Sequence, residues 1–174
     1  MIEANIREIF DEDQIRVSAA VVRESFKTVA REFNLTKENC PTHPSLVTFD
    51  QLMELHRKSL RFYGLFVDMA QFGFVAVERG DDTVYYMEKL AVLPQARHKG
   101  YGEQLVRFAI NYAAEKGAGK LSIGTIHEHI VLKNWYKDLG FVETGTKKFD
   151  HLPFTVCFME KEITTAQRIE GGMK

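Results

Sequence analysis

The feature that most constrains this chain is the stretch LPQARHKGYGEQLV, where a strand-like pattern passes directly into a helix-like one. Gly100 and Gly102 stand at the start of the helical pattern, and Arg97, His98 and Lys99 come just before them. Glycine lets the backbone approach a ligand closely, and the first N–H groups of a helix have no intrahelical acceptor. Such a turn suits a diphosphate, although a solvated basic turn with glycines for geometry only is the simpler interpretation.

Two common nucleotide-binding patterns do not fit this stretch. The Walker pattern requires GxxxxGK followed by Ser or Thr, which the stretch lacks. The dinucleotide pattern GxGxxG would need a third glycine where this chain has Leu105. Nucleotide hydrolysis and hydride transfer are therefore both disfavoured.

The length and charge of the chain set further bounds. A chain of 174 residues buries one core and is too short for two ordinary domains, so we expect a single domain over 1–162 and a polar tail over 163–174. The formal net charge of -1 disfavours binding to nucleic acid or to a membrane surface, so any anion site must be local. The opening residues MIEANIREIF resemble neither a signal peptide nor a membrane span, so we expect a cytoplasmic protein.

Apolar periodicity and turn residues predict alternating strands and helices. Asp11 to Asp13 offer N-cap candidates for a first helix, and Thr48 with Gln51 is a possible capping box for a second helix ending near Leu60. We expect the remaining helices over 102–117 and 130–139, and strands over 5–10, 62–69, 72–78, 83–93, 120–126, 141–149 and 154–161. The helix that follows the fourth of these strands is long enough for a crossover, which permits one parallel pair in a mostly antiparallel sheet.

Two motifs carry a resemblance to a known family. Arg97-x-x-Gly100-x-Gly102 after EKLAVLP resembles the acetyl-CoA motif of the GNAT N-acetyltransferase superfamily, and YKDLGF, which begins at Tyr136, is similar to a second pattern of that family. The resemblance is specific over about residues 83–146. It implies an α/β (α+β) fold with a mixed, mostly antiparallel central sheet of about seven strands, flanked by about four helices. Two neighbouring strands of that fold splay apart to form the acetyl-CoA cleft.

The resemblance also implies which residues hold acetyl-CoA. Main-chain groups of Leu90, Ala91 and Val92 would pair with the pantetheine arm, and one of their N–H groups would polarise the thioester carbonyl. The residues of the glycine turn would hold the diphosphate: Arg97, His98, Lys99, Gly100, Tyr101 and Gly102. His129 stands where the family often has an asparagine that contacts the cofactor, and an imidazole there suits either that contact or acid/base work.

Acyl transfer to an amine needs two proton-handling groups, because the amine must attack in its neutral form and a proton must be returned to the departing thiolate. Tyr136 matches the family's tyrosine that donates to the sulfur of coenzyme A. Glu88 is the candidate base, because it precedes Leu90 by two residues on the same strand and would share its face. Deprotonation by a histidine or through water remains an alternative.

A metal site is not expected. Cys40 and Cys157 belong to no CxxC pair, and although Cys40 and His43 could be imagined as ligands beside His127 and His129, no motif spacing joins the two pairs. A buried or idle thiol is the simpler interpretation of each cysteine.

These observations support one function and leave two alternatives. The resemblance implies an acetyl-CoA-dependent N-acetyltransferase in which a primary amine attacks the thioester directly in a ternary complex. The long connection over 34–50 suits a covered pocket, so we expect a small-molecule amine as the acceptor. The alternatives are acetylation of a protein or peptide amine, and a non-catalytic module that only binds acyl-CoA. Homodimers are common in the family, so a homodimer is also a possibility.

Overall fold

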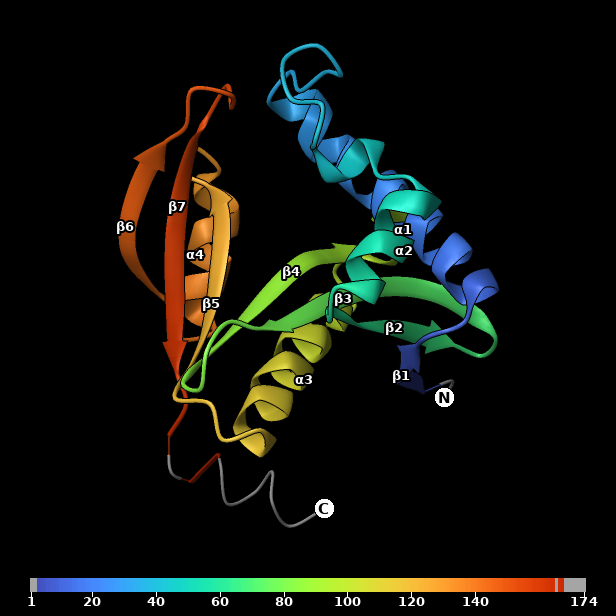
Figure 1. The fold of residues 1–174 in the computed structure, drawn as a ribbon, viewed down its shortest axis with the longest axis vertical. Helices are drawn as coiled ribbons and strands as arrows, with labels where there is room; N and C mark the ends of the chain where they lie inside the picture. The colour runs from blue at the N-terminus through green and yellow to red at the C-terminus, as the bar shows by residue number, and fades with distance from the viewer. Residues whose placement is uncertain (1–2, 165, 168–174) are drawn as a thin grey trace.

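The computed structural model describes residues 3–164 and 166–167, in which strands and helices alternate as expected (Figure 1). The strands are β1 (Ala4–Ile9), β2 (Arg61–Val67), β3 (Ala70–Arg79), β4 (Val84–Val92), β5 (Lys120–Ile126), β6 (Val142–Lys148) and β7 (Thr155–Glu162). The helices are α1 (Glu12–Glu32), α2 (Phe49–Arg57), α3 (Tyr101–Glu115) and α4 (Ile130–Asp138), with short 3-10 turns at Pro44–Leu46 and Pro94–Ala96. Within the described ranges, none of the helices is both long enough and apolar enough to cross a membrane.

Local sequence signals set the ends of the helices. Asp11 caps α1 by accepting a hydrogen bond from the N–H of Gln14 at 2.8 Å, and the predicted capping box of Thr48 and Gln51 is present at the start of α2. Helix α2 ends at Arg57 rather than near Leu60, because the chain turns at Ser59, which has a φ of 97°. These caps confirm the helix starts that the sequence predicts.

The strands form one seven-stranded sheet in the order β1-β2-β3-β4-β5-β7-β6. All neighbours pair antiparallel except β4 and β5, which are parallel. That parallel pairing is confined to residues 84–86 of β4 and 120–122 of β5. Beyond them the two strands diverge, which divides the sheet into a β1–β4 part and a β5–β7–β6 part (Figure 1). The predicted mixed, mostly antiparallel fold with splayed strands is therefore confirmed.

Apolar side chains cover the β1–β4 part of the sheet on both faces. Helix α3 packs on one face, which we call the α3 face, where Leu105 and Ala109 are fully buried. Helices α1 and α2 pack on the opposite α1/α2 face, where Val22 and Leu52 are fully buried (Figure 1). Burying one such aliphatic side chain contributes about 1.5–3 kcal/mol relative to leaving it exposed. The two layers hold β3 and β4 rigidly beside the splay.

The core continues slightly past the last strand. Ile163 is only 4% exposed, and its N–H donates to the carbonyl of Gly119 at 2.9 Å. Most of the expected tail over 163–174 lies outside the described residues, so the division of the chain at residue 162 stays a prediction.

Candidate functional site

A β-bulge interrupts β4 at its centre. The ladder between β3 and β4 pairs Ala76 with Glu88 and Phe74 with Ala91, so two residues of β4 oppose a single residue of β3. Lys89, the first of those two, has a φ of 52°, in a region that residues other than glycine rarely enter. The extra residue shifts the alternation of side chains along the rest of the strand.

Because of this bulge, Glu88 and Leu90 point to opposite faces of the sheet, and the expectation that they share a face is wrong. Glu88 pairs with Ala76, which belongs to the core layer of the α1/α2 face. Leu90 instead packs against the core layer of the α3 face. The carboxylate of Glu88 therefore lies on the α1/α2 side of the splay.

The second half of β4 has a free edge in the middle of the sheet. Strand β5 pairs only with residues 84–86 of β4, so the edge that Leu90, Ala91 and Val92 present toward the splay has no strand partner within the described sheet. On their other side, Ala91 and Val92 pair with β3. An extended ligand can pair with such an edge through main-chain hydrogen bonds. The three residues expected to contact pantetheine therefore lie together beside the splay.

The glycine turn presents a run of unpaired N–H groups. Gly100 is the N-cap of α3 with a φ of 81°. No side chain among the described residues caps this helix, so its first three N–H groups have no acceptor there. Within the described ranges, the N–H groups of residues 98–100 also donate to no protein acceptor. Six consecutive N–H groups, from residue 98 to residue 103, thus lie at the positive end of the α3 dipole. Such a run of free N–H groups suits a diphosphate, whereas a turn with only a structural role would not need it.

The side chains around this turn differ in their exposure to solvent. His98 and Lys99 are exposed, so both can approach an anion on the turn. Tyr101 is half-buried against the α3-face core. A Cβ atom at Gly102 would lie 3.4 Å from the ring of Trp135, which shows how closely α4 approaches the start of α3. The glycine turn therefore lies beside α4.

The side chain of Arg97 points away from the turn, into the protein. Its guanidinium donates to the carbonyl of Val92 at 3.2 Å, to the hydroxyl of Thr28 at 3.0 Å and to the carbonyl of Ser25 at 2.8 Å. These bonds fasten the end of β4 to α1. The N–H of Arg97 also donates, to the carbonyl of Pro94 at 3.3 Å, so the motif arginine acts mainly in the fold.

Tyr136 is buried on α4 with its hydroxyl available. Its ring packs between Trp135 and Phe141, with centroids 5.0 Å and 5.5 Å away. Burial raises the pKa of the hydroxyl above its ordinary value, so the group remains protonated at neutral pH. Among the described residues every fully buried side-chain N or O atom has a hydrogen-bond partner, whereas the Tyr136 hydroxyl has none. The oxygen is therefore reachable from outside the core, although the residue is only 6% exposed.

Glu88 has a neighbouring carboxylate that the sequence did not reveal. Glu78 of β3 is two residues from Ala76, the partner of Glu88, so both carboxylates lie on the α1/α2 face. Lys89 pairs with Glu88 at 3.1 Å, while Glu78 has no ion pair in the described part of the chain. Burial and then the charge of Glu88 raise the pKa of Glu78, and Lys89 partly offsets this. No motif marks Glu78; only the strand register brings it beside Glu88.

His129 connects the start of α4 to the end of α1. Its Nδ1 caps α4 by accepting from the N–H of Leu132 at 3.4 Å, and its Nε2 lies 4.0 Å from Glu32. Its ring is also 5.3 Å from that of Phe33. A neutral ring that accepts at Nδ1 carries its proton on Nε2, an assignment that follows from this bond. A contact between His129 and the cofactor stays a prediction.

The four residues considered as metal ligands do not assemble. His43 is buried with its Nδ1 2.8 Å from the hydroxyl of Ser45. Within the described residues, the ligand-type atoms that do lie close together, within 4.8 Å of one another, belong to His127, Glu143 and Cys157. That cluster surrounds the ammonium group of Lys133, which is taken up below.

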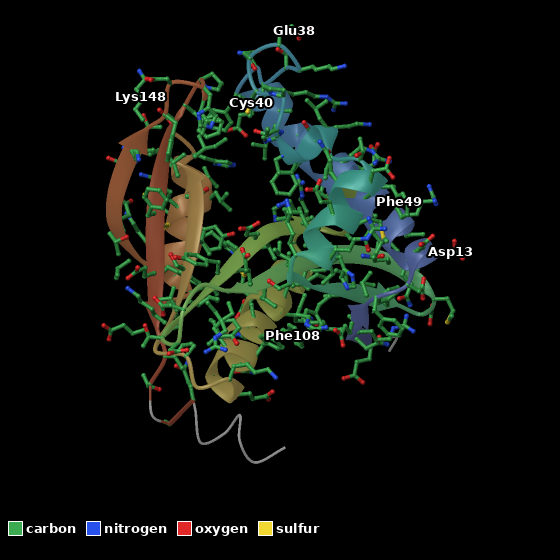
Figure 2. The ribbon with its side chains drawn as sticks, in the orientation of Figure 1. Asp13, Glu38, Cys40, Phe49, Phe108 and Lys148 are labelled. Atoms are coloured by element: carbon green, nitrogen blue, oxygen red, sulfur yellow. The ribbon has the colours of Figure 1, made fainter. Side chains whose placement is uncertain are left out.

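The connection between α1 and α2 reaches across to the other part of the sheet. Leu35 and Cys40 from this connection form an apolar cluster with Ile126 at the end of β5, and Leu152 and Phe154 pack against it. Figure 2 shows Cys40 at the same end of the molecule as Lys148, which ends β6. The open end of the splay is therefore bounded by chain segments from both parts of the sheet.

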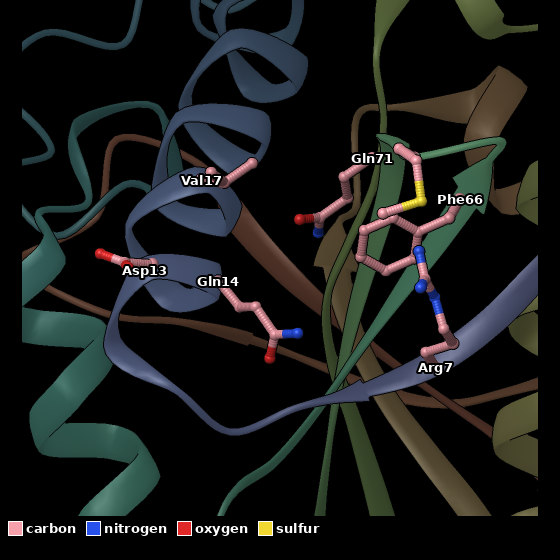
Figure 3. Close-up of a pocket in the computed structure, with 7 residues that line it drawn as sticks. Arg7, Asp13, Gln14, Val17, Phe66 and Gln71 are labelled. Atoms are coloured by element: carbon pink, nitrogen blue, oxygen red, sulfur yellow. The ribbon is translucent and has the colours of Figure 1, made fainter.

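A surface pocket of about 270 Å³ lies elsewhere, between the start of α1 and the outer strands (Figure 3). In it the guanidinium of Arg7 stacks 3.9 Å from the ring centroid of Phe66, with Gln14 and Gln71 beside them. Neither β4 nor β5 lines it, so it is separate from the splay and the glycine turn.

A splayed mixed sheet, with a free strand edge that leads to an anion-binding helix start, is the fold of the acetyl-CoA-dependent acetyltransferases. The chain belongs to the acetyltransferase (GNAT) family, whose profile matches residues 25–141. The expected class, N-acetyltransferase, is thereby confirmed at the level of the family.

Individual relatives agree with this assignment. The chain is 35% identical over 60 residues to the uncharacterized N-acetyltransferase YhfO of Bacillus subtilis, a match that spans 34% of this chain and only 40% of that protein. It resembles the structure of PaiA N-acetyltransferase from Thermoplasma acidophilum in complex with coenzyme A, with a TM-score of 0.68 at 18% identity over 92% of this chain and 99% of that one. It also resembles YncA from Salmonella typhimurium with acetyl-CoA, with a TM-score of 0.69 at 15% identity over 93% and 95% of the two chains. At these identities the structural likeness establishes the fold alone.

Proposed function

We propose that this protein transfers the acetyl group of acetyl-CoA to a primary amine by direct attack within a ternary complex. The observation that carries the proposal is the edge of residues 90–92, which has no strand partner toward the splay, together with the six free N–H groups of residues 98–103. The first suits the amide-containing pantetheine arm, and the second suits the diphosphate.

In the proposed reaction, the lone pair of the neutral amine attacks the thioester carbonyl carbon, a C–N bond forms and the C–S bond breaks. Glu88 or Glu78, directly or through water, takes the proton that the amine loses, because both carboxylates lie on the α1/α2 face at the bulge. A main-chain N–H at the bulge would stabilise the negative charge that develops on the carbonyl oxygen.

Tyr136 would donate a hydrogen bond to the departing sulfur. The raised pKa of its hydroxyl keeps the donor protonated, but it also makes complete proton transfer to a thiolate less favourable. Its contribution is therefore expected to be hydrogen bonding to the developing negative charge rather than a full proton transfer.

A small-molecule amine is the acceptor that the surroundings of the splay favour. The α1–α2 connection and the β6–β7 connection meet in one apolar cluster at its open end, which restricts access from that side. An acidic peptide is disfavoured, because the carboxylates of Glu78 and Glu88 lie together on the α1/α2 face and would repel a substrate of like charge there.

The test is a thiol-release assay with acetyl-CoA against a panel of polyamines, amino acids, aminoglycosides and peptides. With an accepted amine, we expect Tyr136→Phe to lower kcat by about 100-fold and to change the KM for acetyl-CoA less than about twofold. Tyr112→Phe on α3 is the matched control, since Tyr112 packs among other aromatic rings of the α3 face. Binding of acetyl-CoA without turnover of any amine would instead identify a non-catalytic module, and failure to bind acetyl-CoA would refute the proposal.

A further inference from the structure

The network around Lys133 is a buried charged cluster that the proposed reaction does not use. The side chain of Lys133 is 6% exposed, and its Nζ lies 3.2 Å from Oε1 of Glu143 on β6. The same Nζ lies 3.1 Å from Nδ1 of His127, which follows β5. Lys137, one turn further along α4, reaches Glu143 at 2.9 Å but is 47% exposed. One buried and one exposed lysine therefore share a single carboxylate.

Burying an ammonium group is unfavourable unless its hydrogen bonds are satisfied, so this arrangement constrains its neighbours. Hydrogen bonds from Lys137 and then from Lys133 hold the pKa of Glu143 below its ordinary value. A charged lysine can only donate, so Nδ1 of His127 must accept, and the neutral ring then carries its proton on Nε2. His127 and Glu143 therefore both act as hydrogen-bond acceptors for the ammonium group. Lys133 supplies the positive charge that a metal ion would bring to this cluster.

The position of Lys133 connects this network to Tyr136. Lys133 precedes Tyr136 by three residues, so the two side chains lie on the same side of α4, one turn apart. The Tyr136 hydroxyl has no hydrogen-bond partner among the described residues, so no neighbouring polar group fixes its position. Its placement depends on the packing of its ring and on how α4 sits against the β5–β7–β6 part of the sheet. Lys133 bonds to His127, which follows β5, and to Glu143 on β6. These two bonds fix how α4 packs against that part of the sheet.

We propose that Lys133 is a positioning residue: its buried ammonium group joins α4 to the end of β5 and to β6, and so holds the Tyr136 hydroxyl where it meets the leaving sulfur. The proposal rests on the role that we propose for Tyr136. If Lys133 had a purely structural role, replacing it would lower kcat equally with and without the tyrosine hydroxyl. If it positions Tyr136, the loss of kcat depends on that hydroxyl, and the two cases can be told apart by measurement.

The experiment is a double-mutant cycle with Lys133→Met and Tyr136→Phe, read as kcat and KM in the thiol-release assay. A displacement of about 1 Å costs a catalytic group up to roughly 100-fold, so we expect Lys133→Met to lower kcat by about 10- to 100-fold. The KM for acetyl-CoA should change less than about twofold, because the glycine turn is untouched. In the Tyr136→Phe background the same substitution should lower kcat by less than about twofold, because the group that it positions is already gone.

Lys137→Met is the matched control, because it removes the exposed lysine from the same carboxylate and should leave kcat within about twofold of wild type. His127→Ala provides a second route that leaves the Lys133–Glu143 pair in place, and its smaller loss of kcat should also vanish in the Tyr136→Phe background. Cooperative urea unfolding and calorimetric acetyl-CoA binding establish that each variant is folded.

Each remaining outcome overturns the inference in a recognisable way. Equal losses from Lys133→Met in the two backgrounds would show a general structural role, with the proposed function intact. An unchanged kcat for Lys133→Met would show that Tyr136 is held by its ring packing alone. If Tyr136→Phe turns over like wild type, the role of the tyrosine fails, and the positioning role of Lys133 fails with it.

Discussion

Replacing Arg97 by methionine separates a role in the fold from a role in cofactor binding. The motif arginine is expected from the sequence to contact the diphosphate, yet its guanidinium donates three hydrogen bonds to Val92, Thr28 and Ser25. Methionine keeps most of the apolar stem and removes the donors. The substitution should therefore weaken the junction between α1 and the end of β4 and leave the free N–H groups of the turn in place.

The size of the effect follows from the three bonds. A hydrogen bond from a charged donor contributes about 1.5–3 kcal/mol. The total should be smaller than three times this value, because Arg97 is only partly buried and the Ser25 carbonyl also accepts from the hydroxyl of Thr28. We expect the free energy of unfolding to fall by about 2–4 kcal/mol, and Tm to fall by about 4–15 °C.

The assay is urea denaturation followed by circular dichroism, combined with calorimetric titration of acetyl-CoA well below the unfolding transition. Lys99→Met is the control, because Lys99 is exposed and should change the free energy of unfolding by less than about 0.5 kcal/mol. The control should weaken acetyl-CoA binding severalfold in a salt-dependent way. The reasoning would be refuted if Arg97→Met unfolded like wild type and bound acetyl-CoA tenfold more weakly, since the guanidinium would then act on the cofactor.

Three further outcomes test other parts of the structure. Leu105→Ala removes a fully buried side chain of the α3 face and should lower the free energy of unfolding by about 2–5 kcal/mol in the same denaturation assay. Gly100→Ala and Gly117→Ala should each cost about 1–2 kcal/mol of stability, because the two glycines have nearly equal φ values of 81° and 80°, but calorimetry should show weaker acetyl-CoA binding only for Gly100→Ala. Glu78→Gln should raise stability at neutral pH, and urea midpoints measured across pH should show this gain disappearing below about pH 4.

The sign of the Glu78 effect follows from linkage. A carboxylate whose pKa is raised on folding favours the fold while it is protonated, and this contribution is lost as pH rises through the folded-state pKa. At neutral pH the ionised Glu78 lies partly buried beside Glu88, which opposes folding. A constant difference between Glu78→Gln and wild type across the acid range would contradict this account.

The features that the sequence could predict are those encoded by a few adjacent residues. The capping box of Thr48 and Gln51 and the N-cap at Asp11 depend on contacts three residues apart, so residue type and spacing are sufficient. The length of the α3 connection permits the parallel pairing that β4 and β5 make. The free N–H groups of the turn follow from Gly100 starting a helix without a capping side chain.

The features that the sequence could not predict depend on residues far apart in the chain. The bulge at Lys89 reverses the face of Leu90, although nothing in EKLAVL distinguishes a bulged strand from a regular one. Arg97 turns inward because α1, about 70 residues earlier, offers it acceptors. Lys133 reads as a surface lysine on an amphipathic helix until His127 and Glu143 are placed around it. In each case tertiary contacts decide where a polar side chain points.

The charges of Glu78 and Lys133, on the two sides of the splay, can be interpreted in the same way. On the α1/α2 face, Glu78 has no ion-pair partner among the described residues, and on α4 the ammonium group of Lys133 is nearly inaccessible to water. An apolar or amide side chain of similar size would serve stability as well or better at both positions. Charges that oppose folding persist where function needs them, because selection removes only those that bring stability below a threshold. If both charges serve the reaction, Glu78→Gln should gain stability and lose kcat, while Lys133→Met should lose kcat with little change in stability. A variant that kept full kcat at either position would assign that charge to the fold alone.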